Sequence, residues 1–136
     1  MESHAVTRLV EDAAEPARCE AHFADRLAFY TDPFDLHAEL ERGEDGVVVL
    51  FCADRDFYEA HHVPGAHWLH YRDITPGTVD WPKDTLIVVY GKGGACNVGP
   101  KAALRLARLG YRVKELDGGM TQWMADGFPV SKGVEP

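Results

Sequence analysis

The sequence predicts an α/β domain in which a mostly parallel sheet is covered by helices on both faces. Two short continuous runs of β-forming residues, 47–51 and 86–90, are typical of strands buried on both sides. Segments with helical spacing alternate with these strands through short connections, which favours parallel pairing. The 136 residues, 46% of them hydrophobic, suffice for one domain with a sizeable core.

The N-terminal part divides into an arm and the beginning of the domain. Residues 1–16 are acidic and without periodicity, so we expect an irregular arm followed by a single domain over 17–136. Within 17–30, Cys19, Phe23, Leu27 and Tyr30 recur at helical spacing. This pattern predicts a helix that packs through one face, with Cys19 in the core.

Capping residues indicate where the next helices begin and end. Asp32 is a good N-cap, Pro33 suits a first helical position, and Gly43 is typical of a helix end. After the strand at 47–51, Asp54 is expected to cap a short helix.

The second half of the chain contains the remaining elements. Residues 62–66 predict a tight turn, residues 68–69 a brief strand, and Pro100 the start of a helix that ends before Gly110. A strand over 112–116, an Asp-Gly-Gly turn and a helix over 120–125 follow.

Net charge separates the chain into two parts and excludes several functions. The formal net charge is −8, and all of it arises in residues 1–50, since the remainder is balanced. An acidic chain argues against nucleic-acid and membrane partners. The N-terminus lacks the basic and apolar regions of a secretory signal, and three scattered cysteines make no disulfide framework, so we expect a cytoplasmic protein.

The loop after the strand at 86–90 is the best candidate for chemistry. It reads Gly-Lys-Gly-Gly-Ala-Cys-Asn-Val-Gly over 91–99 and runs into a helix N-terminus. Such a loop can turn its amides inward as an anion-binding nest, and Lys92 and Lys101 are expected to favour a Cys96 thiolate. The other interpretation is a glycine-rich turn in which Cys96 only packs.

Three segments of the chain are similar to the motifs of one known domain family. The first is Tyr-Glu-Ala-His-His-Val-Pro-Gly-Ala over 58–66, which is similar to that family's aromatic residue followed by G-H-I-P-G-A. The second comprises the strand at 86–90, its loop, and the helix Ala-Ala-Leu-Arg-Leu-Ala-Arg-Leu-Gly-Tyr. The third is Val-Lys-Glu-Leu-Asp-Gly-Gly-Met-Thr-Gln-Trp over 113–123. They occur in the order and spacing of the rhodanese domain family, which the chain resembles across roughly residues 30–130, and the leader and loop are similar to those of single-domain bacterial members.

The resemblance implies a three-layer rhodanese-like fold and a sulfurtransferase activity. In that chemistry a cysteine takes sulfane sulfur from a small anionic donor such as thiosulfate and passes it to a thiol, a protein acceptor or cyanide. Loop amides stabilise the thiolate and the persulfide, and no cofactor is expected. Here the resemblance assigns Cys96 as the candidate catalytic residue. The predicted substrate- or anion-binding loop contains Gly91, Lys92, Gly93, Gly94, Ala95, Asn97, Val98 and Gly99.

The chain departs from the family pattern at three positions near this loop. Gly91 stands where most rhodaneses have the nucleophile, and Phe51 and Ala53 replace the family's D-x-R pair. Two functions therefore remain open. Either Cys96 is a relocated nucleophile, or the domain is catalytically inactive and binds a small anion or a protein.

Other uses of the reactive side chains were weighed against this resemblance. Cys52 also follows a strand, so it could form a redox disulfide with Cys96. A phosphatase needs an arginine five residues after its cysteine, where this chain has Lys101. The histidines between 61 and 70 are irregularly spaced for a metal site, which we do not expect. The tryptophans, Trp123 above all, are expected to pack.

Overall fold

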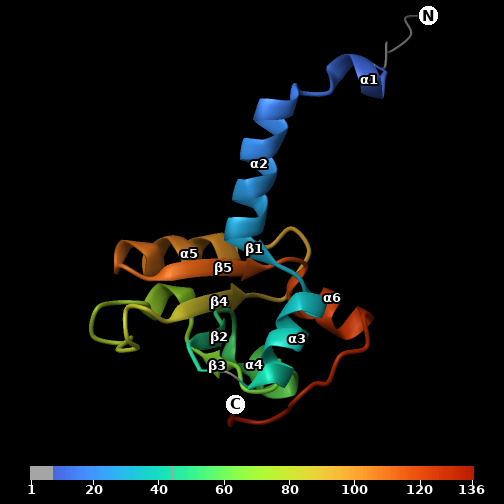
Figure 1. The fold of residues 1–136 in the computed structure, drawn as a ribbon. Coiled ribbons are helices and arrows are strands. Elements are labelled where there is room, and N and C mark those ends of the chain that lie inside the picture. Colours follow the sequence, from blue (N-terminus) through green and yellow to red (C-terminus); the bar gives the residue numbers. More distant parts are fainter. Residues whose placement is uncertain (1–7, 44) are drawn as a thin grey trace, which may run out of the picture.

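A computed structural model describes residues 8–43 and 45–136 and shows five strands in one parallel sheet (Figure 1). The strand order is β1-β5-β4-β2-β3, and every pair is parallel. This confirms the predicted α/β class. The strands are β1 Tyr30–Thr31, β2 Val47–Phe51, β3 His67–Trp68, β4 Leu86–Tyr90 and β5 Arg112–Leu116.

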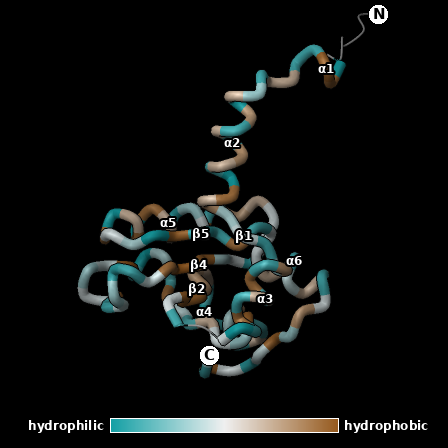
Figure 2. Tube along the Cα trace, viewed as in Figure 1, coloured by the Kyte–Doolittle hydropathy of each residue, from teal (hydrophilic) through white to brown (hydrophobic). Residues whose placement is uncertain are grey.

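Helices cover both faces of the sheet, as the alternation of elements predicts. On one face lie α3 (Pro33–Arg42), α4 (Arg55–Ala60) and α6 (Gly119–Ala125), and on the other lie α5 (Val98–Arg108) and the 3₁₀ turn η1 (Tyr71–Asp73). Successive strand residues point to opposite faces. The apolar strands β2 and β4 therefore supply both cores from the centre of the molecule (Figure 2).

The caps of α3 are confirmed, whereas the cap predicted for α4 is not. The Asp32 side chain accepts a hydrogen bond from the Asp35 amide at 2.8 Å, Pro33 is the first helical residue, and Gly43 adopts φ 66°. Asp54 occupies the N-cap position of α4, but its side chain caps no amide. The carboxylate is instead paired with Lys92, at 3.3 Å.

The N-terminal segment differs most from expectation. Within the arm predicted to be irregular, Leu9–Asp12 form the short helix α1, and residues 1–7 lie outside the described residues. The following helix α2 (Pro16–Phe29) contains no buried residue, and Cys19 is partly exposed rather than in the core. The reason is topological: Tyr30 begins the edge strand β1 instead of continuing the helix, so α2 projects from the body (Figure 1).

Smaller differences concern element boundaries. The helix expected to begin at Pro100 begins at Val98, because a proline lacking its N–H is tolerated within the first turn. The turn η1 has no apolar periodicity that could have revealed it. Among the described residues, no helix is long and apolar enough to span a bilayer.

Candidate functional site

The glycine loop between β4 and α5 lies against the turn between β5 and α6. The amide of Met120 donates to the Gly91 carbonyl at 3.0 Å, and the amide of Thr121 donates to the Lys92 carbonyl at 2.8 Å. A Cβ added at Gly119 would lie 2.6 Å from the Gly91 oxygen and 2.8 Å from the Gly93 nitrogen. Only glycine allows this backbone-to-backbone contact, which fixes the loop at the carboxyl edge of the sheet.

A cavity of about 70 Å³ lies between these two segments. The Cys96 Sγ atom stands 3.7 Å from where a Cβ at Gly91 would be. The only thiol of the loop is thus beside the position that the resemblance assigns to the nucleophile. The cavity is lined by Gly91, Gly93, Gly94, Cys96, Gly99, Glu115, Leu116, Asp117, Gly118 and Gly119.

The backbone amides of the loop that carries Cys96 are a second feature of the site. None of the N–H groups from Gly93 to Gly99 donates a hydrogen bond to another described residue. Glycines at φ 119° (Gly93) and 66° (Gly94) give this stretch a conformation that other residues rarely adopt. Together with the first turn of α5, these free donors can stabilise negative charge on a sulfur atom.

The two lysines expected to favour the thiolate are engaged elsewhere. The Lys92 ammonium pairs with Asp54 and lies 5.3 Å from the centre of the Phe57 ring. That of Lys101 lies 5.3 Å from the Tyr71 ring. Neither residue lines the cavity, so the two lysines contribute no positive charge to its lining.

Two carboxyl groups, which sequence reasoning missed, line the cavity. Glu115 packs so closely on Gly99 that a side chain there would overlap its carboxyl group. Burial raises the pKa of Glu115, the Asp117 carboxylate raises it further, and Arg26 opposes both effects. The Asp117 carboxylate forms an ion pair with Arg26, with 2.7 Å between Asp117 Oδ2 and Arg26 Nη2. The Asp-Gly-Gly turn could have revealed both carboxyl groups, because Asp117 begins the turn and Glu115 lies two residues before it. This turn and the glycine loop share one edge of the sheet.

Cys52 occupies a different environment from Cys96. Its backbone amide donates to the Tyr90 carbonyl at 3.0 Å, which places residue 52 across from the start of the loop. The side chain is fully buried, and burial raises the pKa of its thiol. No disulfide joins the cysteines, and the protonated Cys52 packs with Leu50, Ile87 and other residues of its core.

Aromatic side chains occupy the region where the family's charged pair would lie. Phe51 is buried and its ring lies 5.1 Å from that of Tyr90 and 5.8 Å from that of Phe57. Ala53 is buried beside it. The structure therefore replaces two charged groups by an apolar cluster beneath the loop.

His62 and Trp123 have packing roles. His62 is buried and stacked on Tyr58 at 3.9 Å, and its Nδ1 lies 2.8 Å from the Tyr58 carbonyl oxygen. In residues 8–43 and 45–136, no three histidine, cysteine or acidic side chains gather as a metal site. Trp123 is buried in the core and donates to the Pro129 carbonyl at 2.7 Å, as its predicted packing role requires.

Known proteins resemble this chain in sequence and in structure. It is 35% identical over 113 residues to the HTH-type transcriptional regulator Rv0324 of Mycobacterium tuberculosis, and the match takes in 82% of the chain but half of the regulator. The crystal structure of the BH2092 protein from Bacillus halodurans shares 32% identity, covers 89% of both chains and has a TM-score of 0.84. Thiosulfate sulfurtransferase from Pseudomonas aeruginosa shares 27% identity over 79% of this chain and 20% of its own, with a TM-score of 0.65.

The family comparison agrees with the fold and with the residues that suggested it. The family model described as "Rhodanese-like domain" matches residues 32–126, a range that contains β2 to β5 and the whole glycine loop. The chain therefore belongs to the rhodanese-like domain family.

Proposed function

We propose that this domain transfers sulfane sulfur through a persulfide on Cys96. The observation that carries the proposal is the position of the Cys96 thiol, beside Gly91 and within a loop whose amides from Gly93 to Gly99 donate to no other residue that the structure describes. The similarity to a thiosulfate sulfurtransferase supports the same chemistry. We place the reaction in the cytoplasm, with a small anionic donor such as thiosulfate and a thiol or protein acceptor.

The proposed reaction has two balanced steps. The Cys96 thiolate attacks the outer sulfur of thiosulfate, the S–S bond breaks, and sulfite leaves with the bonding electrons. The product is a Cys96 persulfide anion, which the loop amides stabilise. An acceptor such as cyanide then attacks the outer sulfur, so that thiocyanate leaves and the Cys96 thiolate returns.

Mass spectrometry of the intact protein tests this reaction. Incubation with thiosulfate should add about 32 Da, the mass of one sulfur atom, and dithiothreitol should remove it. The gain should vanish in Cys96→Ser and persist in Cys52→Ala. If neither thiosulfate nor an organic hydropersulfide adds sulfur to the wild-type protein, the transfer function is wrong. A loss of about 2 Da on mild oxidation would instead indicate a disulfide between Cys52 and Cys96.

A second candidate is a non-catalytic module that binds a small anion or a protein. The specific observation in its favour is that Gly91, which has no nucleophilic side chain, occupies the usual nucleophile position. The Glu115 and Asp117 carboxyl groups in the cavity repel small anions, so they favour the protein partner of this alternative. The similarity to half of a protein named as a transcriptional regulator also fits a sensing role. The thiosulfate experiment separates the two, since a module that only binds forms no covalent adduct.

A further inference from the structure

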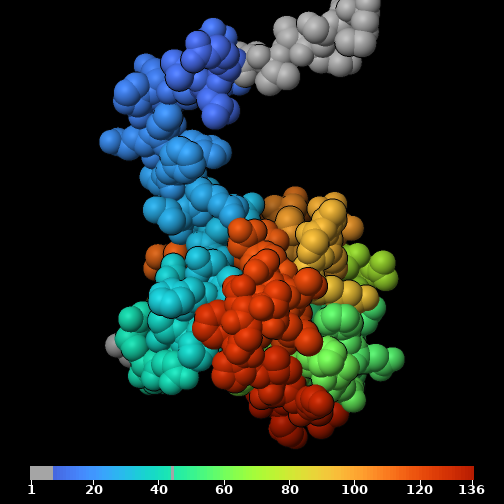
Figure 3. Space-filling model, turned by 90° about the vertical axis from the view of Figure 1, so that its right-hand side faces the viewer, coloured from blue at the N-terminus to red at the C-terminus, as the bar shows by residue number. Residues whose placement is uncertain are grey.

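The projecting helix α2 buries none of its residues against the rest of the described chain. It comprises 14 residues, none of them buried, and stands clear of the body (Figures 1 and 3). Its base is held by Arg26, which pairs with Asp117 and lies 3.8 Å from the centre of the Tyr30 ring. Isolated helices of this length are marginal in water, and most helical stability comes from packing of an apolar face.

The apolar residues of this helix form a continuous stripe. Cys19, Phe23 and Leu27 follow one another at four-residue intervals, so their side chains lie along one side of α2. Phe23 is 59% exposed and Leu27 is 72% exposed. Of the ten large apolar side chains exposed among the described residues, five belong to α1 and α2, so this segment carries far more than its share.

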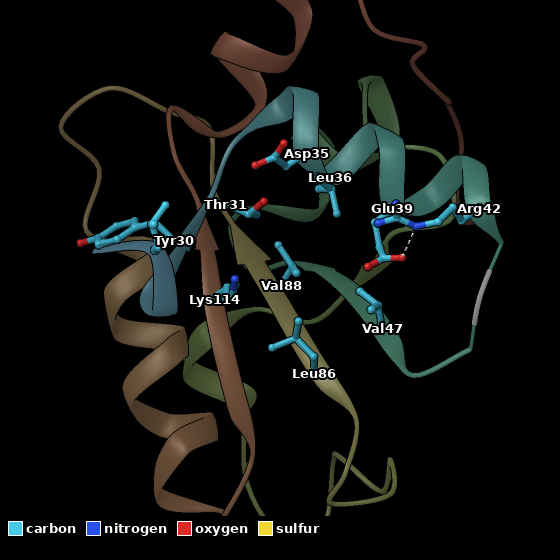
Figure 4. A pocket seen from close by; sticks show the side chains of 11 residues that line it. Tyr30, Thr31, Asp35, Leu36, Glu39, Arg42, Val47, Leu86, Val88 and Lys114 are labelled. Atoms are coloured by element: carbon cyan, nitrogen blue, oxygen red, sulfur yellow. Dashed lines mark hydrogen bonds and ion pairs between the residues drawn. The ribbon is translucent and has the colours of Figure 1, made fainter. Parts of the chain in front are cut away.

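The stripe ends at a groove on the body of the molecule. Leu27 is part of the wall of this groove, which has a volume of about 270 Å³ and lies between α3 and the strands β4 and β5 (Figure 4). Apolar residues of α3, β2 and β4 line one part of the groove, and the charged side chains Asp35, Glu39, Arg42 and Lys114 line the rest. The apolar side chains of the groove are Leu27, Leu36, Val47, Leu86 and Val88.

We propose that a second copy of this chain covers both surfaces, through antiparallel pairing of the two α2 helices. In this arrangement Phe23 of each copy packs beside Cys19 of the other, and α1 of each copy reaches the groove of the other. Leu9 and Val10, which are 87% and 80% exposed, enter that groove. A helix of 14 residues is about 21 Å long, and it holds α1 away from the groove of its own copy.

Charge complementarity favours a second copy in this orientation. Glu15 and Arg26 are eleven residues apart, almost three helical turns, so they lie on the same side of α2. Antiparallel pairing centred near Ala21 brings Glu15 of one copy to Arg26 of the other. An apolar centre with a charged rim is the usual composition of a dimer interface.

The projecting segment is also shared with a solved structure. Residues after Phe29 make up less than four-fifths of the chain, whereas the match to the BH2092 protein covers 89%. The structural similarity therefore extends into α2, which indicates that the projecting segment is a regular part of this architecture.

Sedimentation velocity of the full chain tests the dimer. The wild-type protein should sediment as a dimer at micromolar concentrations, and Phe23→Glu and Leu27→Glu should each be monomeric while unchanged near-ultraviolet circular dichroism shows that the body stays folded. Phe34→Glu is the matched control, because Phe34 is 71% exposed but lies on α3. A wild-type monomer at every concentration overturns the proposal, and so does a dimer that Leu27→Glu leaves intact.

Two further measurements test the orientation and the groove. In a Cys19→Ser background, a short bis-maleimide should join Glu15→Cys in one copy to Arg26→Cys in another, as mapped by peptide masses. Links only between identical positions would overturn antiparallel pairing. Leu9→Glu should raise the dimer dissociation constant at least tenfold, because a leucine loses its burial. An unchanged constant overturns the assignment of α1 to the groove.

Discussion

Cys52 and Cys96 follow neighbouring strands of one sheet, yet the structure gives them opposite properties. Cys52 directly follows β2, where its amide donates to the Tyr90 carbonyl and its side chain is enclosed by core residues. Cys96 lies six residues beyond the end of β4, partly exposed in a loop whose amides have no partner in the described part of the chain. A place at the carboxyl edge of a parallel sheet is therefore not enough for reactivity. The loop that frees the backbone donors makes the difference.

The largest expected effect is the contrast in thiol alkylation. Iodoacetamide should modify Cys96 in the folded protein, whereas Cys52 should react on the order of a thousandfold more slowly, because burial raises the pKa of its thiol and its exposure requires unfolding. The rates are measured by mass spectrometry of peptides at pH 8. In urea the two rates should converge. Rapid labelling of Cys52 in the native protein would show that the comparison is wrong.

A substitution at Gly93 should disrupt the contact between the loop and the turn before α6, whereas one at Gly94 should leave this contact intact. A Cβ at Gly93 would lie 2.9 Å from Thr121 and would overlap the Gly118 carbonyl, at φ 119°. Gly93→Ala should therefore lower the free energy of unfolding by about 3 kcal/mol, through overpacking and backbone strain, and abolish sulfur loading. The measurement is urea denaturation followed by incubation with thiosulfate.

Gly94→Ala is the control for that substitution. Gly94 has φ 66° but no atom within 4 Å of its added Cβ, so we expect a loss of about 1 kcal/mol from backbone strain alone. Equal losses for both variants would mean that contact between the loop and the turn does not hold the site together.

Serine substitution separates the structural thiol from the chemical one. Cys52→Ser places a hydroxyl in a fully buried site and should cost about 2 kcal/mol of unfolding free energy. Cys96→Ser should change the unfolding free energy by no more than about 0.5 kcal/mol, because the residue is partly exposed. Chemical denaturation of both variants checks this. A more costly change at Cys96 would make that thiol a packing residue, as the alternative interpretation holds.

The fold could be predicted from the sequence because its signals are local. The buried strands β2 and β4 are continuous runs of β-formers, and the Asp32-Pro33 pair fixes the start of α3 by capping alone. The prediction that one face of α2 packs in the core is wrong, because amphipathic spacing shows which side of a helix is apolar and not what covers it.

The composition of the cavity was only partly predictable. The glycine loop and Cys96 are adjacent in sequence, so their association needs no tertiary information. Glu115 reaches the same cavity from β5, and Lys92 turns to Asp54, 38 residues earlier in the chain. These distant contacts reverse the expected charge around the thiol. Both contacts depend on the strand order, which places β4 between β5 and β2.

The smallest effect concerns the charge that Glu115 adds to the cavity. A carboxylate there repels an anionic donor, so Glu115→Gln should speed sulfur loading from thiosulfate about tenfold, and added salt should reduce this gain.

The same substitution should also change how stability depends on pH. Because the folded-state pKa of Glu115 is raised, its contribution to stability is favourable below its unfolded pKa and is lost as the pH rises through the folded value. The variant should therefore melt about 2 °C above the wild type at pH 8 and lose this advantage near pH 4. Asp80→Asn removes an exposed carboxylate that is not part of the cavity, and it should change neither quantity. Equal rates of sulfur loading in Glu115→Gln and the wild type would mean that the loop amides alone determine how an anion reaches Cys96. The carboxyl groups of Glu115 and Asp117 would then have no effect on the reaction.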